Sequence, residues 1–364
     1  MGVLEQAVEK LRRARWLITL VLIAALGLGV WLVVRPSRPT SPELLVGVDD
    51  DTLKWTPFPL TVVRRQRRLG VDAVRISVPW HGEAVPSAVR RVELLRAETA
   101  ARQTAVVLSV FGFAAVTPVD ARAQARFCSY AHAALALVPD ARAVVVWNEA
   151  NSPTYWRGTP AEYESLLARC YDELHTSHLV VLDSTASAHG PATFLDALAE
   201  AYRASGRRRP LMDAFGHNPY PLNIGEQPGV RHAGDFIGEG DYARLIATLR
   251  AGFAGTAQRS LAIWYLEDGF QAQIPVHLQH HYRGHETVAV VAADVQAEHV
   301  VSAIHLAACQ PLVRAFFNFE LVDERRLAGW QSGLIWRGGH EKPAAAAFAT
   351  AARHVAAGTV DCRP

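Results

Sequence analysis

Two stretches decide the fold of this 364-residue chain: residues 143–151 read AVVVWNEAN, and residues 261–269 read LAIWYLEDG. Each begins with a continuous apolar run of strand length and ends at a carboxylate, Glu149 in the first and Glu267 in the second. Continuous apolar runs, as opposed to alternating ones, are typical of parallel strands covered on both faces. The two stretches therefore predict buried parallel strands that each end at an acid.

Apolar runs of this kind recur along the chain and alternate with amphipathic stretches. Strands are predicted at residues 44–48, 73–78, 105–110, 143–147, 179–183, 214–217, 261–266 and 315–319. Helices are predicted near residues 60–69, 87–102 and 121–137, from Thr159, near 192–204, 240–251 and 295–308, and from Pro343. Eight alternations predict an α/β fold, a (β/α)8 TIM barrel. An open doubly wound sheet is the alternative, but the first strand–helix turn has no convincing glycine-rich phosphate loop to support it.

The N-terminus predicts a membrane anchor. Residues 16–34 are uncharged, rich in Leu, Ile and Val, and long enough to cross a bilayer as one helix. Residues 1–15 contain four basic residues just before this run, so we expect them to stay in the cytoplasm. A Pro/Ser linker at 35–43 then leads to the barrel, residues 44–364, outside the cytoplasm. A cleavable signal peptide is the alternative, and it would also export the barrel.

Export permits disulfides, and the chain has four cysteines. Cys128 and Cys170 fall on consecutive predicted helices, while Cys309 and Cys362 fall near the ends of the last two. We therefore predict the pairings 128–170 and 309–362. Other pairings and four buried free thiols remain open, whereas the spacings match no zinc motif.

Composition narrows the class of protein. Half of the residues are hydrophobic and 20% are charged, which indicates a globular chain. The formal net charge is only +2, so no nucleic-acid partner is expected.

The two strand-end glutamates are the candidates for chemistry, because barrel enzymes react at the carboxyl ends of their strands. Cleavage of a glycosidic bond needs such a pair. One acid protonates the departing oxygen, and the other attacks the anomeric carbon or activates water. The two environments must differ so that one acid stays protonated near neutral pH. Asn148, directly before Glu149, can hydrogen-bond a sugar 2-hydroxyl.

The motifs WNEAN and YLEDG resemble those of clan A glycoside hydrolases, the retaining superfamily of cellulase-like and β-xylosidase-like TIM barrels. That clan has Asn-Glu at the end of strand four and Glu at the end of strand seven. The resemblance extends over about residues 44–358. It implies that Glu267 is the nucleophile and Glu149 the general acid/base of a double displacement, and that no cofactor is needed.

The same resemblance suggests further site residues. Arg75, in VRISVPW, should hydrogen-bond the nucleophile and hold it ionised. The stretch DAFGHNPYP resembles the strand-six element of the clan, so Tyr220 should bond Glu267, and His217 or Asn218 should line the sugar site. The match is displaced by one residue, because the family histidine would stand where Asn218 is.

The C-terminal part also resembles the clan, with FFNFE at residues 316–320 and Lys342-Pro343 opening the last helix. Clan members often have a tryptophan on strand eight as a sugar platform, and this strand has none. Trp330, Trp336 or Trp80 are the expected replacements.

Four histidines, His277, His280, His281 and His285, follow strand seven. Adjacent side chains point in different directions and no carboxylate motif frames the cluster, so no metal site is expected.

Together these features predict an anchored, extracytoplasmic hydrolase of β-linked poly- or oligosaccharides. By analogy alone, its substrate would be a cell-envelope polysaccharide or exopolysaccharide. A non-catalytic carbohydrate-binding or envelope-assembly barrel, and a transglycosylase, remain open alternatives.

Overall fold

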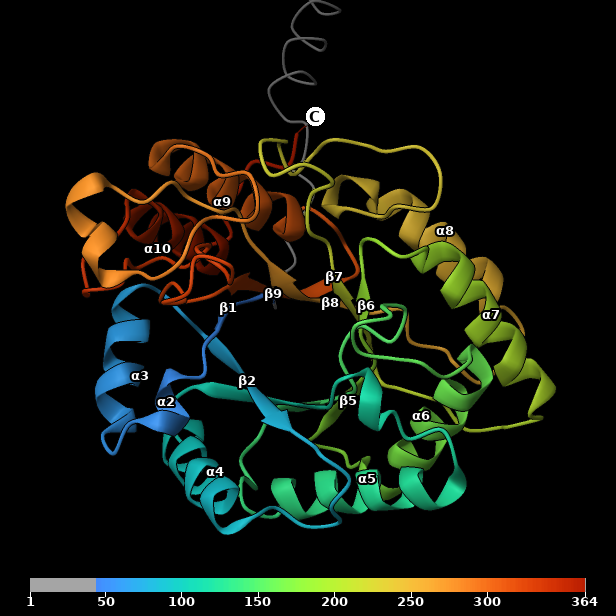
Figure 1. Cartoon of the computed structure of the whole chain (residues 1–364). Helices are drawn as coiled ribbons and strands as arrows, with labels where there is room; N and C mark the ends of the chain where they lie inside the picture. The colour runs from blue at the N-terminus through green and yellow to red at the C-terminus, as the bar shows by residue number, and fades with distance from the viewer. Residues whose placement is uncertain (1–43, 364) are drawn as a thin grey trace, which may run out of the picture. The chain divides into compact units, whose positions relative to one another are not determined.

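The computed structural model describes residues 44–363 (Figure 1). The predicted anchor at 16–34 and the linker at 35–43 lie outside this range. Within it, no helix is long and apolar enough to cross a membrane.

Strands and helices alternate along the described residues much as the sequence predicts. The strands are β1 (Leu45–Asp49), β2 (Ala73–Pro79), β3 (Ala105–Phe111), β4 (Ala143–Val146), β5 (Val180–Leu182), β6 (Thr185–Ala186), β7 (Phe215–Asn218), β8 (Ile263–Asp268) and β9 (Val313–Phe319). The helices are α2 (Thr52–Trp55), α3 (Pro59–Arg68), α4 (Ala88–Ala101), α5 (Ala121–Leu135), α6 (Pro160–Leu174), α7 (Pro191–Ala204), α8 (Tyr242–Gly252), α9 (Ala293–Ala308) and α10 (Pro343–Ala356). The short helix α2 has no counterpart among the predicted elements, and the fifth predicted strand is divided into β5 and β6.

All strand pairs are parallel, in the order β5-β4-β3-β2-β1-β9-β8-β7-β6. The two ends of this order, β5 and β6, are separated in the chain only by Asp183 and Ser184. A further parallel bridge joins Leu182 to Ala214, just before β7. The order therefore begins and ends on one chain segment, and Figure 1 shows the helices surrounding the strands. This α/β architecture is consistent with a TIM barrel.

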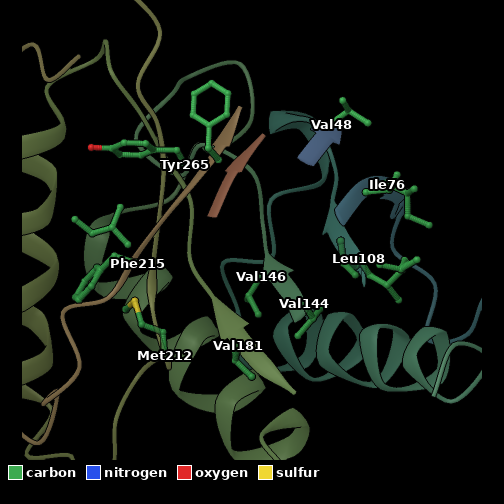
Figure 2. Close-up of a cluster of buried hydrophobic side chains, with 14 of the residues drawn as sticks. Val48, Ile76, Leu108, Val144, Val146, Val181, Met212, Phe215 and Tyr265 are labelled. Carbon is green, nitrogen blue, oxygen red and sulfur yellow. The ribbon is translucent and has the colours of Figure 1, made fainter. Parts of the chain in front are cut away.

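The strands bury both of their faces, as the continuous apolar runs predict. One set of side chains packs against the helices and includes Val48, Ile76, Leu108, Val146 and Val181 (Figure 2). The alternate residues form a separate inner cluster that includes Ala73, Val107, Val145, Leu266 and Phe317. This period of two is the geometry of a strand, and it assigns each strand position to the inner or the outer face.

Gly47 shows how closely the inner cluster is packed. A Cβ at this position would lie 2.6 Å from the ring of Phe317 and 2.7 Å from the carbonyl oxygen of Ala73. Glycine is therefore required for β1 to approach its neighbours at this depth.

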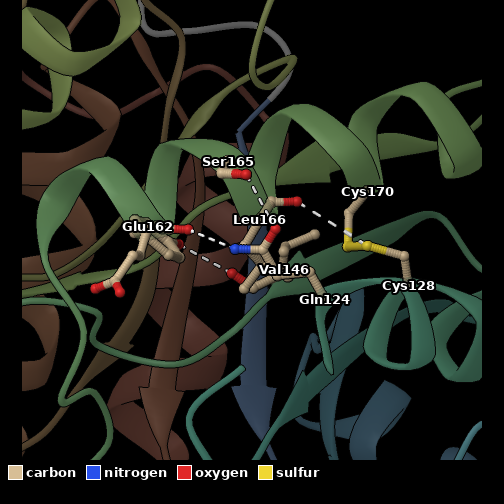
Figure 3. Close-up of a disulfide and its surroundings, with 8 residues drawn as sticks. Gln124, Cys128, Val146, Glu162, Ser165, Leu166 and Cys170 are labelled. Carbon is tan, nitrogen blue, oxygen red and sulfur yellow. Dashed lines mark hydrogen bonds between the residues drawn. A yellow bond between two sulfur atoms is a disulfide. The ribbon is translucent and has the colours of Figure 1, made fainter. Parts of the chain in front are cut away.

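Both predicted disulfides are confirmed. Cys128 on α5 is bonded to Cys170 on α6, with Cα atoms 5.0 Å apart (Figure 3). Cys309 at the end of α9 is bonded to Cys362, beyond α10, with Cα atoms 5.3 Å apart. The amide of Gln124 on α5 also donates to the carbonyl oxygen of Glu162 on α6. These links fix pairs of outer helices that are consecutive in the chain.

Candidate active site

Arg75 is the centre of a buried polar cluster at the carboxyl ends of the strands. Its side chain is buried, and Nη1 donates to an oxygen of Asp49 and, at 2.7 Å, to Oε1 of Glu267. Nη2 donates to the hydroxyl oxygen of Ser109 at 2.9 Å and to Oδ1 of Asn148 at 2.8 Å. One guanidinium thus joins side chains from β1, β3, β8 and the end of β4, and its charge offsets those of two carboxylates.

The strand period explains why these groups meet. Gly47, Ala73 and Val107 line the barrel interior, so the residues two positions later point inward one layer above. Those residues are Asp49, Arg75 and Ser109. The cluster is therefore the polar layer that closes the apolar interior at the mouth of the barrel.

Glu267 and Glu149 each have a specific partner beyond this cluster. The second oxygen of Glu267 accepts a hydrogen bond from the hydroxyl of Tyr220 at 3.2 Å. Oε1 of Glu149 accepts from Nδ2 of Asn218 at 2.9 Å. Asn148, between the strand and Glu149, is held through Oδ1 by Arg75.

The environment of Glu149 favours its protonated form. Burial raises the pKa of Glu149 to about 7, and the negative charge of Glu267 acts in the same direction. The hydrogen bond from Asn218 and the positive charge of Arg75 oppose this rise. Glu267, by contrast, has the Arg75 guanidinium within direct hydrogen-bonding distance. The two carboxyl groups are therefore placed in different electrostatic environments, as an acid and a nucleophile require.

Each glutamate lies where its strand departs from regular geometry. Trp147 and Glu149 have positive φ angles of 71° and 42°, values that cost a non-glycine residue on the order of 1–3 kcal/mol. Along β8, the pairing with β9 shifts register between Tyr265 and Asp268. Such irregularities re-aim side chains. Regular alternation would place Glu267 on the outer face beside Tyr265, and the shift instead directs it to inward-facing Arg75.

Packing around the WNEAN stretch holds this conformation. The indole nitrogen of Trp147 donates to the carbonyl oxygen of Tyr155 at 3.0 Å, and its ring contacts Phe127 and Trp156. Asn151 donates to the carbonyl oxygens of Ala186 and Ala188 and accepts from the amide of Ala186. Trp147 and Asn151 therefore have structural roles, and they fix the backbone that presents Glu149.

A cavity of about 490 Å³ lies beside Tyr220, the hydrogen-bond partner of Glu267. It is lined by the segment 220–225 after β7, by residues of the loop after β8, and by Trp330. The indole of Trp330 lies 5.1 Å from the ring of Tyr220 and 5.4 Å from that of Phe319, between centroids. Tyr220 both lines the cavity and bonds Glu267, so this residue connects the cavity to the candidate site.

No protein-family profile matches the chain, and no curated protein matches it. Solved structures do match. A family 39 glycoside hydrolase from the gut symbiont Bacteroides cellulosilyticus WH2 superposes with a TM-score of 0.62 at 15% identity, over 86% of this chain. The chain spans 64% of the length of that enzyme.

Structures of GH5_18 proteins match over more of their own length. A variant from Streptomyces cattleya, in complex with Manβ1-4GlcNAc, has a TM-score of 0.63 at 19% identity, with 88% of this chain and 83% of that chain covered. A GH5_18 protein from Bifidobacterium longum subsp. longum has a TM-score of 0.62 at 14% identity, with 88% and 81% covered. The fold is that of clan A glycoside hydrolases.

Two residues predicted for the sugar site are not available to a ligand. Trp80 is 1% exposed, packs against Phe127 and Trp147, and donates through its indole nitrogen to the carbonyl oxygen of Glu83. The prediction of Trp80 as a sugar platform is therefore wrong. Trp336 is also buried, with the ammonium of Lys342 over its ring at 4.2 Å.

The prediction that His217 lines the sugar site is also corrected. His217 is 1% exposed, and its ring nitrogens lie 2.9 Å from the hydroxyl oxygen of Thr185 and 2.8 Å from the carbonyl oxygen of Ile237. Burial lowers the pKa of His217 to about 4, so the ring is neutral. Both of its nitrogens are occupied by the protein, and the neighbouring Asn218 reaches Glu149 instead.

Three site residues were not predicted from the sequence. Asp49 and Ser109 are partners of Arg75, and their inward strand positions are the signal that could have identified them. Tyr155 lies in the loop after β4, hydrogen-bonds Asn148, and is close enough to both glutamates that their charges raise its pKa, after burial. No sequence pattern points to Tyr155.

The loop after β8 contains the four histidines noted in the sequence, and η3 (Val276–His281) includes three of them. Residues 44–363 contain no group of three or more His, Cys, Asp or Glu side chains that could hold a metal ion.

Proposed function

We propose that this chain is a retaining glycoside hydrolase that cleaves β-linked poly- or oligosaccharides by double displacement. The observation that supports this most is the asymmetric carboxylate pair. Glu267 is held by Arg75 and Tyr220, while Glu149 is buried with a pKa raised to about 7. Their positions at the ends of β8 and β4 match the pattern of the clan whose fold the chain shares.

In the first step, the Glu267 carboxylate attacks the anomeric carbon, and Glu149 donates its proton to the departing glycosidic oxygen. The pKa of Glu149 makes this donation possible near neutral pH. In the second step, the Glu149 carboxylate takes a proton from water, which attacks the anomeric carbon and releases Glu267. Retention implies a separation of about 5–5.5 Å between the two carboxyl groups.

Neighbouring groups have defined parts in this mechanism. Arg75 orients Glu267 and balances its charge in the resting enzyme, and Tyr220 fixes its second oxygen. Asn148 is oriented by Arg75 through Oδ1, so its Nδ2 is directed to a donor role toward the sugar 2-hydroxyl. Trp330, with its ring beside Tyr220 in the cavity, is the proposed sugar platform.

We also propose that the barrel is held at the outer face of a membrane through residues 16–34, or is secreted after cleavage there. The uncharged run and the basic residues before it support this orientation. The two disulfides are compatible with an oxidising compartment. An envelope polysaccharide or exopolysaccharide would be the substrate at that location.

Release of reducing sugar from a panel of β-linked glycans and aryl glycosides tests the proposal. The parent is compared with Glu149→Gln and Glu267→Gln, which keep the shape of each side chain. We expect activity in the parent and a loss of about a thousandfold or more in both variants. Activity that survives in either variant would show that the residue has another role. No release by the parent on any glycan would contradict the proposal.

A further inference from the structure

The cavity beside Tyr220, which we call the apolar cavity, has a composition unlike a site for a bare sugar. Most of its lining is apolar: Pro221, Leu222, Ile224, Val288, Ala289 and Trp330. Leu222 and Val288 are 55% and 51% exposed, although large apolar side chains are usually withdrawn from water. Its volume of about 490 Å³ is within the range of about 300–1,000 Å³ typical of small-molecule sites.

The polar side chains of the lining already donate to protein oxygens. Tyr220 donates to Glu267, and Asn223 donates to Glu226. Gln271 donates to the carbonyl oxygen of Gly329 at 3.5 Å and accepts from the backbone amide of Gln331 at 2.5 Å. Trp330 offers a sugar ring a stacking face, but a sugar that filled the rest of the cavity would bury several hydroxyl groups with few partners, which is unfavourable. An apolar group has no hydrogen bonds to lose in the same place, and its transfer from water into the cavity is favourable.

The position of the cavity identifies the molecule that would bring such a group. Tyr220 is both part of the lining and the hydrogen-bond partner of Glu267, and Gly269, two residues beyond Glu267, is also in the lining. An occupant would therefore contact Tyr220, whose hydroxyl bonds the proposed nucleophile. A separate apolar ligand would compete with the saccharide at this distance, whereas a group attached to it would bind together with it.

We propose that the apolar cavity binds an apolar group covalently attached to the substrate saccharide, such as an acyl ester on the sugar or an alkyl or aryl aglycone. This inference rests on the proposed function and specifies its substrate class. The cavity raises the affinity for substrates that bear such a group. Each methylene transferred from water contributes about 0.8 kcal/mol, or about fourfold in Kd.

Binding to the full chain with Glu149→Gln tests this without turnover, so failure of the proposed hydrolysis would not affect the readout. Titration calorimetry, together with the fluorescence of Trp330 and the other tryptophans, follows two series of probes. The first runs from methyl to butyl to hexyl β-D-glucopyranoside. The second runs from methyl β-D-glucopyranoside to its 6-O-acetyl and 6-O-hexanoyl esters. The first series places the apolar group on the aglycone, and the second places it on the sugar.

We expect Kd to fall by at least tenfold along one of the two series, and that series identifies where the group is attached. Leu222→Asn and Val288→Asn, both at exposed positions, should flatten the gradient without unfolding the protein. Val276→Asn is the matched control, because Val276 lies on the same loop as Val288, is 82% exposed, and is not part of the lining. Equal affinities within both series would overturn the proposal. So would a gradient that persists in the two lining variants, or one that is lost equally in the control.

Discussion

Replacement of Arg75 by methionine tests how the polar cluster is held together. The substitution keeps an apolar side chain about as long as the stem of arginine and removes the only cation that contacts Asp49 and Glu267 among the described residues. All of the groups concerned are buried, with Arg75 at 1%, Asp49 at 6% and Glu267 at 8% exposure. Removing one partner of a buried ion pair costs about 3–5 kcal/mol, because the other charge is left without compensation.

The loss should depend on pH in a defined direction. Burial already raises the pKa of Asp49, and Arg75 opposes that rise, so the pKa of Asp49 should rise further in the variant. A carboxyl group whose pKa is higher in the folded protein than in the unfolded chain destabilises the fold at pH values above its unfolded-state pKa. Because burial raises the pKa of Asp49 to about 8 in the parent, a further rise destabilises the variant only as the pH passes that value, so the deficit of Arg75→Met should be larger at pH 9 than at pH 6.

Thermal and urea unfolding of parent and variant at both pH values measure this. At about 2 °C per kcal/mol for a domain of this size, we expect Tm to fall by about 6–10 °C at pH 9, and by less at pH 6. The control is Asp49→Asn combined with Arg75→Met, which should recover part of the stability because one buried charge is gone. A deficit below about 1 kcal/mol, or one that does not change with pH, would refute the reasoning.

Three further predictions concern the acid, the last helix and the outer shell. Asn218→Ala removes a hydrogen bond that lowers the pKa of Glu149. The basic limb of the kcat/KM profile, near pH 7 in the parent, should therefore move to higher pH. An unchanged limb would exclude Glu149 as the titrating acid. Lys342→Met should destabilise the fold by about 3–5 kcal/mol in urea unfolding, because the ammonium donates to fully buried Asp323 at 2.7 Å. A change within experimental error would mean that Asp323 protonates at little cost. Replacing both cysteines of the α5–α6 disulfide by alanine should lower the free energy of unfolding by about 2–4 kcal/mol and leave activity unchanged. Lost activity in a variant that remains folded would contradict a purely structural role for this disulfide.

Those site residues that follow a recognisable strand could be predicted from the sequence. The runs AVVVW and LAIWYL each stop at an acid, and the structure places Glu149 and Glu267 near a shared mouth beside Arg75. The pattern could not show the positive φ angles at the end of β4 or the register shift in β8. These irregularities depend on tertiary packing, and they direct the two side chains.

The incorrect predictions have a common physical cause. His217 was considered together with Asn218, although successive strand residues point to opposite faces. Phe215 packs outward, so His217 also points outward, while Asn218 shares the inward face with Ala214. Trp80 follows β2, where no alternation constrains a side chain, and its ring enters the core beside Phe127. Residues in loops, such as Tyr155, are placed by contacts that no local pattern records.

Covalent trapping of the nucleophile tests the central proposal most directly. Once the panel has identified a glycoside that the parent cleaves, its 2-deoxy-2-fluoro analogue with a good leaving group should glycosylate Glu267, expel the leaving group and remain bound. Peptide mass spectrometry should then find one added fluoroglycosyl group on the peptide that contains Glu267, and none in Glu267→Gln. A label on any other residue, or inactivation by none of the analogues while the parent glycoside is still cleaved, would contradict the assignment of Glu267 as the nucleophile.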